Sequence, residues 1–225
     1  MKGVSEISLL VLFLSIPVVG CAGGPMPPPL DARSPRPPLD QDGFVSHTEE
    51  ITVHVPMEFL HEWRHGSSGH LENTLRGTNK IAGVARTEMI NGTWPEPGAR
   101  RRVIRRDGNQ SLEEVLQNTW PTSFRYEVWG FTDRERILAD YLVGEFQHGN
   151  APDGTLVKWT YSFHRRWALA TPLLSMVVRD RVPEFMQTAL LNMKEQAEVA
   201  YKRQQDANGA ARDKSIERDP GPFPH

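Results

Sequence analysis

Alternating apolar and polar residues run through the middle of the chain and limit the folds open to it. In the clearest case Val157, Trp159, Tyr161 and Phe163 alternate with polar residues over 158–164. A period of two places the apolar side chains on one face of a half-buried strand. Strands are predicted at 44–55, 81–91, 99–107, 111–119, 123–131, 140–148 and 155–166. Because the connections between them are short and rich in turn residues, consecutive strands are expected to pair in an antiparallel sheet.

Helical periodicity is found at two places outside these strands. Pro56 suits the first position of a short helix over 56–65. A far longer helix is predicted from 172 to about 205. Its broad apolar stripe comprises Val178, Val182, Phe185, Met186, Ala189, Leu190, Met193 and Ala197. The strands therefore belong to an α+β domain in which the long helix covers the apolar face of the sheet.

This order of elements resembles the START-like (SRPBCC, polyketide cyclase/dehydrase) superfamily over about 45–200. The resemblance lies in the opening strand that runs into Pro56, in Gly154-Thr155 before Val157-Lys158-Trp159, and in the closing helix. It implies a helix-grip fold, in which a curved antiparallel sheet of about seven strands wraps around a long C-terminal helix above an apolar cavity. Members of that superfamily bind lipids, polyketides, hormones or other hydrophobic molecules, and only some are catalysts. The fold alone therefore does not decide between binding and catalysis.

Composition excludes several other classes for this chain of 225 residues. One cysteine rules out a disulfide scaffold, and a mean hydropathy of −0.49 rules out a polytopic membrane protein. A net charge of −2 argues against a nucleic-acid partner held by bulk positive charge.

The N-terminal region has the features of an export signal. An apolar run over 7–19 is too short to span a bilayer and is typical of a signal peptide. Val18-Val19-Gly20-Cys21 resembles the lipobox of bacterial lipoproteins. That resemblance implies cleavage before Cys21, lipidation of its sulfur, and a bacterial membrane anchor with the domain in the periplasm. Ala22 slightly favours the outer membrane, and the alternative is an ordinary secretory signal in which Cys21 is incidental.

Four segments follow from these patterns. Residues 1–20 are predicted to be the signal peptide, and 21–42 a lipidated cysteine followed by a proline-rich tether, since 25–38 holds seven prolines. The START-like ligand-binding domain is predicted at 43–201. Residues 202–225 are polar, end in a proline-rich stretch, and are predicted to be a disordered tail.

The inward-facing rows of the expected fold supply the candidate ligand-binding residues. They are Phe124, Tyr126, Val128, Trp159, Tyr161, Phe163, Phe185, Met186 and Ala189. Aromatic walls with a few polar tips suit a hydrophobic small molecule or lipid. The alternative is that these side chains simply fill the core. A cyclase/dehydrase-like enzyme could use the same cavity, but no acid–base pair can be placed in it from the sequence, and no cofactor is predicted.

One short motif supports a different chemistry. His61-Glu62-Trp63-Arg64-His65 matches H-E-x-x-H, in which two histidines one helical turn apart bind zinc and the glutamate activates water. Against a zinc hydrolase, Gly66-Ser67-Ser68-Gly69 ends the helix at once and no third ligand is evident. Trp63 is expected to pack on the sheet, which leaves His61 and His65 on the flanks of the helix.

The densest basic cluster comprises Arg100, Arg101, Arg102, Arg105 and Arg106. We interpret it as a solvated strand whose cross-strand partners include Glu113 and Glu114. The alternative is contact with anionic lipid head groups or with an acidic ligand at the rim of the pocket.

Overall fold

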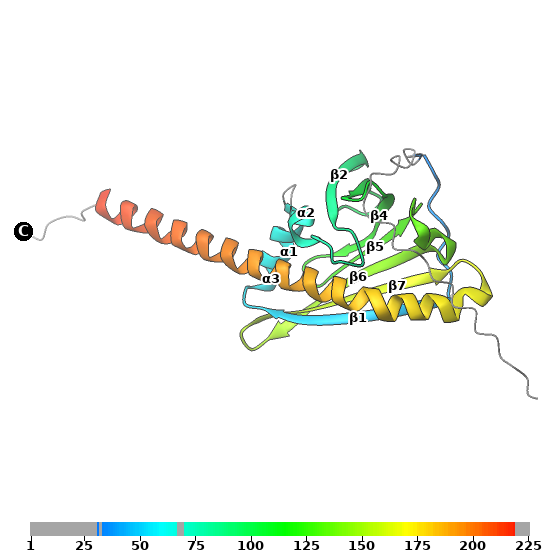
Figure 1. Ribbon diagram of the computed structural model, residues 1–225. Coiled ribbons are helices and arrows are strands. Elements are labelled where there is room, and N and C mark those ends of the chain that lie inside the picture. The colour runs from blue at the N-terminus through cyan, green and yellow to red at the C-terminus, as the bar shows by residue number, and fades with distance from the viewer. Residues whose placement is uncertain (1–30, 32, 67–69, 219–225) are drawn as a thin grey trace, which may run out of the picture.

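A single antiparallel sheet and one long helix dominate the computed structural model, which describes residues 31, 33–66 and 70–218 (Figure 1). The strands are β1 (Phe44–Val53), β2 (Val84–Asn91), β3 (Arg100–Arg105), β4 (Gln110–Thr119), β5 (Ser123–Trp129), β6 (Ala139–Ala151) and β7 (Gly154–Arg165). The helices are α1 (Met57–Gly66), α2 (His70–Thr74) and α3 (Thr171–Arg218), with short 3-10 turns η1 (Arg134–Ile137) and η2 (Ala168–Ala170). The sheet order β1-β7-β6-β5-β4-β3-β2 leaves β1 and β2 at the two edges. The predicted α+β helix-grip architecture is confirmed.

The register of the central strands sets the aromatic rows on the face that α3 covers. Phe146 on β6 pairs with Trp159 on β7, and their rings stack with centroids 4.9 Å apart. Tyr126 on β5 lies opposite Gly144 on β6, and a Cβ atom at Gly144 would overlap the Tyr126 ring. The missing side chain at Gly144 therefore gives the tyrosine ring room to lie across the sheet.

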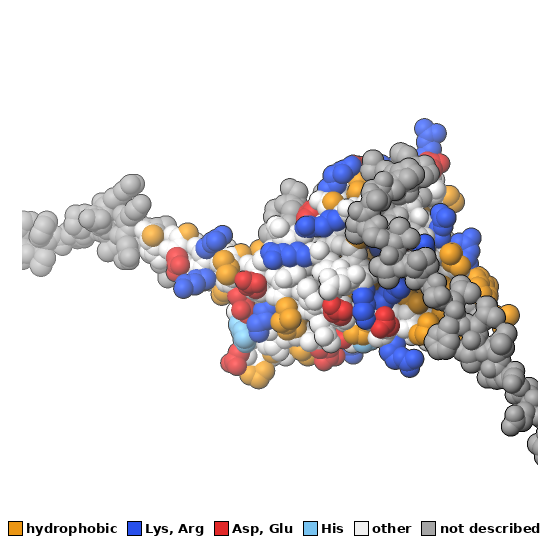
Figure 2. Space-filling view, viewed as in Figure 1, with side chains coloured by type: hydrophobic (Ala, Val, Ile, Leu, Met, Phe, Trp, Pro, Cys, Tyr) orange, Lys and Arg blue, Asp and Glu red, His pale blue; other side chains and the backbone are white. Residues whose placement is uncertain are grey.

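Helix α3 lies across the sheet beside β1 and then projects beyond the rest of the domain (Figure 1). Its buried positions follow the predicted stripe from Val178 to Ala197, except that Phe185 is only partly buried. The prediction of a disordered tail at 202–225 is wrong for its first part, because the helix continues to Arg218. Residues over 202–210 are exposed and mix basic, acidic and apolar side chains (Figure 2). Good helix formers such as Ala, Gln, Lys and Arg prolong the helix there, and the next proline comes only at Pro220.

Part of the predicted proline-rich tether lies against the opposite face of the sheet instead of extending as a free spacer. Arg36 donates to Glu127 at 2.6 Å and also contacts Glu114 at 3.1 Å. The backbone N–H of Asp40 donates to the Tyr141 hydroxyl at 2.9 Å. Glu127 is fully buried, so a cation from this segment is needed to balance its charge. Residues around 34–40 therefore cover the back of the domain.

The predicted signal segment 1–20 and Cys21 lie outside the described residues. Within the described ranges, no helix combines the length and apolar character that crossing a bilayer requires. Helix α2 was not predicted, because its five residues are too few for a hydrophobic period to be recognised.

Candidate functional site

Two cavities lie between the sheet and α3. The first, of about 100 Å³, is walled by α1, α2, the central strands and the α3 residues Ala189, Leu190 and Met193. The second, of about 120 Å³, lies toward η1 and the N-terminal part of α3. Leu75 and Glu113 line both cavities, so the two are neighbouring chambers.

Eight of the nine predicted ligand-binding residues line one of these chambers. Phe124, Tyr126, Trp159 and Ala189 line the first chamber, and Val128, Tyr161, Phe163 and Phe185 line the second. Met186 is fully buried and lines neither, so it packs in the core. Their contact with a ligand remains a prediction.

A pair of tyrosines marks the boundary between the chambers. The Tyr126 hydroxyl donates to the Tyr161 hydroxyl over 3.2 Å. Burial raises the pKa of Tyr126 to about 12, and burial together with the Tyr126 hydroxyl raises the pKa of Tyr161 well above its ordinary value. Both rings therefore stay neutral at physiological pH and offer hydroxyl groups in an otherwise apolar region.

The first chamber also contains charged side chains. Arg101 forms a 2.6 Å ion pair with Glu113 across β3 and β4, and its guanidinium carbon lies 3.5 Å from the centroid of the Trp94 ring. The predicted cross-strand pairing with Glu113 is confirmed, but the predicted solvated environment is wrong for this pair, because Glu113 is only 6% exposed. Glu72 of α2 lines the same chamber, with its Oε2 atom buried and without a hydrogen-bond partner.

Arg64 is the unexpected residue of this chamber. Its guanidinium carbon lies 3.1 Å from the centroid of the Phe146 ring and 5.5 Å from that of Phe124. No carboxylate of the described chain forms an ion pair with Arg64. Burial, reinforced by the nearby charge of Arg101, lowers the pKa of Arg64 to about 9. It still carries a proton at neutral pH, which makes it an unbalanced interior cation.

The two motif histidines lie inside the domain rather than on the flanks of the helix. His61 is buried, and its ring centroid lies 4.7 Å from that of His65 and 5.9 Å from that of His148 on β6. His65 in turn packs on Phe124, with ring centroids 4.3 Å apart. α1 thus presents its histidines to the sheet.

The histidine cluster differs from the hydrolytic zinc site that the H-E-x-x-H motif suggests. Glu62 is exposed, whereas His61 is buried and His65 is partly buried, so the glutamate lies at the surface while the histidines point into the domain. No three histidine, cysteine or acidic side chains of the described residues are arranged to hold a metal ion. Burial, followed by the positive charge of Arg64, lowers the pKa of His65 and brings that of His148 to about 4.

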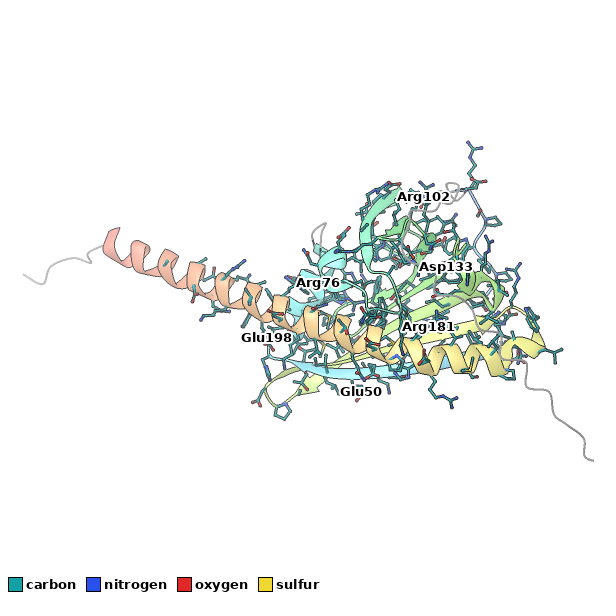
Figure 3. The ribbon with its side chains drawn as sticks, in the orientation of Figure 1. Glu50, Arg76, Arg102, Asp133, Arg181 and Glu198 are labelled. Carbon is teal, nitrogen blue, oxygen red and sulfur yellow. The ribbon has the colours of Figure 1, made fainter. Side chains whose placement is uncertain are left out.

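A polar groove of about 450 Å³ lies beside the second chamber. Arg105 and Arg181 line both, and Arg105 forms an ion pair with Asp133. Figure 3 shows Arg181 on α3 facing the part of the domain that carries Asp133. The groove gives the second chamber a charged rim toward the surface.

Comparisons with known proteins bear on the fold alone. No protein-family model matches the chain, and no curated protein matches it. Among solved structures, Ara h 8.0201 is similar with a TM-score of 0.55 and 22% identity, over 69% of this chain and 98% of that one. TTHA0849 from Thermus thermophilus gives 0.52 and 17%, over 69% and 99%. Major latex-like protein 151 from Panax ginseng gives 0.51 and 12%, over 69% and 99%. These likenesses support the helix-grip fold of START-like proteins.

Proposed function

We propose that this protein binds a hydrophobic small molecule or lipid in the space between its sheet and α3, and that it does so while attached to a bacterial membrane through lipidated Cys21. The observation that carries the proposal is the pair of adjoining chambers with largely apolar and aromatic walls. Cavities of this kind bury most of a ligand and orient it with a few polar groups. The protein would act as a carrier, a sensor or an accessory factor in the periplasm.

The size of the chambers limits the ligand. An apolar cavity of about 150 Å³ holds a benzene-sized molecule. Chambers of about 100 and 120 Å³ each suit one small ring or a short alkyl segment. A ligand that fills both must pass Leu75 and the tyrosine pair. We therefore expect a slender molecule rather than a bulky polycyclic one.

Filling the first chamber with protein should abolish binding. Ala189 is buried on α3 and lines this chamber, so Ala189→Phe is expected to weaken the binding of 1-octanol to the full chain at least about tenfold. Isothermal titration calorimetry measures the change. Leu191→Phe adds the same ring two residues along, at a side chain that is 60% exposed, and should leave affinity unchanged. If the unaltered protein binds no octanol, or if both variants bind it equally, the cavity is not the binding site.

The surface near η1 and η2 supports a location at a membrane. Ile137, Trp167, Leu169 and Leu173 are all exposed, with Leu169 at 83%. The Trp167 indole donates to the Ile137 carbonyl at 3.1 Å, which joins the two turns, and exposed arginines flank both. Tryptophan and aliphatic side chains beside basic residues are typical of surfaces at the lipid–water interface.

Membrane attachment itself is tested at Cys21. Expressed in a bacterium, the full chain should incorporate labelled palmitate and fractionate with membranes. Cys21→Ser should lose the label and leave the membrane fraction, because the acyl chains supply most of the anchoring energy. Ala22→Ser changes the neighbouring residue and should leave both properties intact. An unlabelled wild-type protein would make Cys21 incidental.

A further inference from the structure

The first chamber holds polar atoms that lack partners. Nη1 of Arg64 and Nε1 of Trp159 are both buried, neither has a hydrogen-bond partner among the described residues, and both residues line the chamber. A guanidinium and an indole N–H can only donate. Buried donors are nearly always satisfied in folded proteins, so unpaired ones point to a missing acceptor. Both side chains contact the ring of Phe146: the Arg64 guanidinium carbon lies 3.1 Å from its centroid, and the Trp159 ring stacks on it with centroids 4.9 Å apart.

The charges of the chamber define what kind of acceptor is missing. Arg101 is already paired with Glu113. Glu72 lines the chamber but forms no ion pair with Arg64 among the described contacts. Arg64 therefore has no ion-pair partner among the described residues, although the lining holds as many carboxylates, Glu72 and Glu113, as guanidinium groups. A ligand with a single negative charge would pair with Arg64 directly, whereas a dianion would bring a second charge toward Glu72 and Glu113.

We propose that the ligand is an amphipathic monocarboxylate whose carboxylate is bound by Arg64 in the first chamber. This inference rests on the proposed function. A guanidinium presents parallel N–H groups that match both oxygens of a carboxylate. The Trp159 indole N–H is a second donor in the lining of this chamber. The apolar part of the ligand lies along Phe124 and Phe146 and extends past the tyrosine pair toward the second chamber. The small volume of the chambers favours a medium-length chain or a single ring.

Matched eight-carbon probes test this assignment on the full chain. Octanoate and 1-octanol share the alkyl chain and differ in charge, and octyl phosphate replaces the carboxylate by a phosphate. We expect octanoate to bind at least about tenfold more tightly than octanol, and more tightly than octyl phosphate. In Arg64→Met, which keeps an unbranched apolar side chain, the preference for octanoate over octanol should disappear.

Arg86→Met is the matched control, because the Arg86 side chain is 62% exposed on β2 and pairs with Glu88. It should keep the preference for octanoate. Equal affinities for octanoate and octanol in the unaltered protein would overturn the carboxylate site while leaving the proposed function intact. Tighter binding of octyl phosphate would overturn the choice of a carboxylate. Binding of none of the probes would instead count against the proposed function. The comparison in the unaltered protein decides the matter even if a variant fails to fold.

Discussion

Acidification from pH 7.5 to pH 5.0 is expected to destabilise this protein by about 3 kcal/mol through its buried histidine cluster. Burial and the charge of Arg64 lower the pKa of His65 and bring that of His148 to about 4, and the pKa of His61 is lowered for the same reasons. In the unfolded chain these groups titrate near pH 6.5. Between pH 6.5 and 4 the unfolded state therefore binds more protons than the folded state, so stability rises with pH in that window.

The magnitude follows from the shift of each group. A histidine that stays neutral in the folded state and titrates at pH 6.5 when unfolded contributes about 2 kcal/mol at pH 5. His148 is only 7% exposed, so we expect it to contribute the full amount of about 2 kcal/mol to the loss of unfolding free energy. His65 retains some accessible surface, so its contribution to this loss is smaller. Well above pH 6.5 the histidines of the cluster are neutral in both states, and the loss vanishes.

Urea unfolding followed by tryptophan fluorescence at the two pH values measures this loss. His148→Gln removes one titrating group, so the difference between the two pH values should shrink by about 2 kcal/mol. His54→Gln is the control, since the His54 side chain is 51% exposed and pairs with Glu198 instead of joining the buried cluster. An unchanged pH dependence in His148→Gln would mean that this ring is not held neutral by its surroundings.

The fold was predictable because its signals are local. The alternation over 157–164 and the stripe over 178–197 each repeat within one element, and each reports which side of that element is buried. The same rows place eight candidate residues on chamber walls, since the inward face of a strand is also the face that lines any cavity. Chambers and core are built from the same residue types, so the sequence could not separate Met186 from its neighbours.

The features that the sequence did not predict depend on contacts between distant segments. His148 joins His61 and His65 only because β6 passes behind α1. Arg36 reaches Glu127 across 91 residues, and no local pattern marks that pair. Arg64 occupies an unconstrained position of the H-E-x-x-H motif, so the motif does not mark it as a site residue.

Removing that cation should stabilise the protein. Arg64→Met is expected to raise the free energy of unfolding by about 1 kcal/mol at pH 7.5, because a partly buried charge without an ion-pair partner among the described residues is replaced by an apolar side chain of similar length. The contacts of Arg64 with Phe146 and Phe124 offset part of its desolvation, which is why the expected gain is modest. A side chain that destabilises the unliganded fold is retained more readily where it serves a ligand.

Arg64→Met should change both the stability at pH 7.5 and the dependence of stability on pH. Arg64 is the first neighbouring charge that lowers the pKa of both His65 and His148. Without it the histidines accept protons more easily in the folded state, so Arg64→Met should lose less stability between pH 7.5 and 5.0 than the unaltered protein does. Urea unfolding of Arg64→Met and Arg86→Met at both pH values measures the gain and the weaker pH dependence together. A loss of stability in Arg64→Met would show that Arg64 stabilises the unliganded core, and the argument for an unbalanced interior cation would then fail.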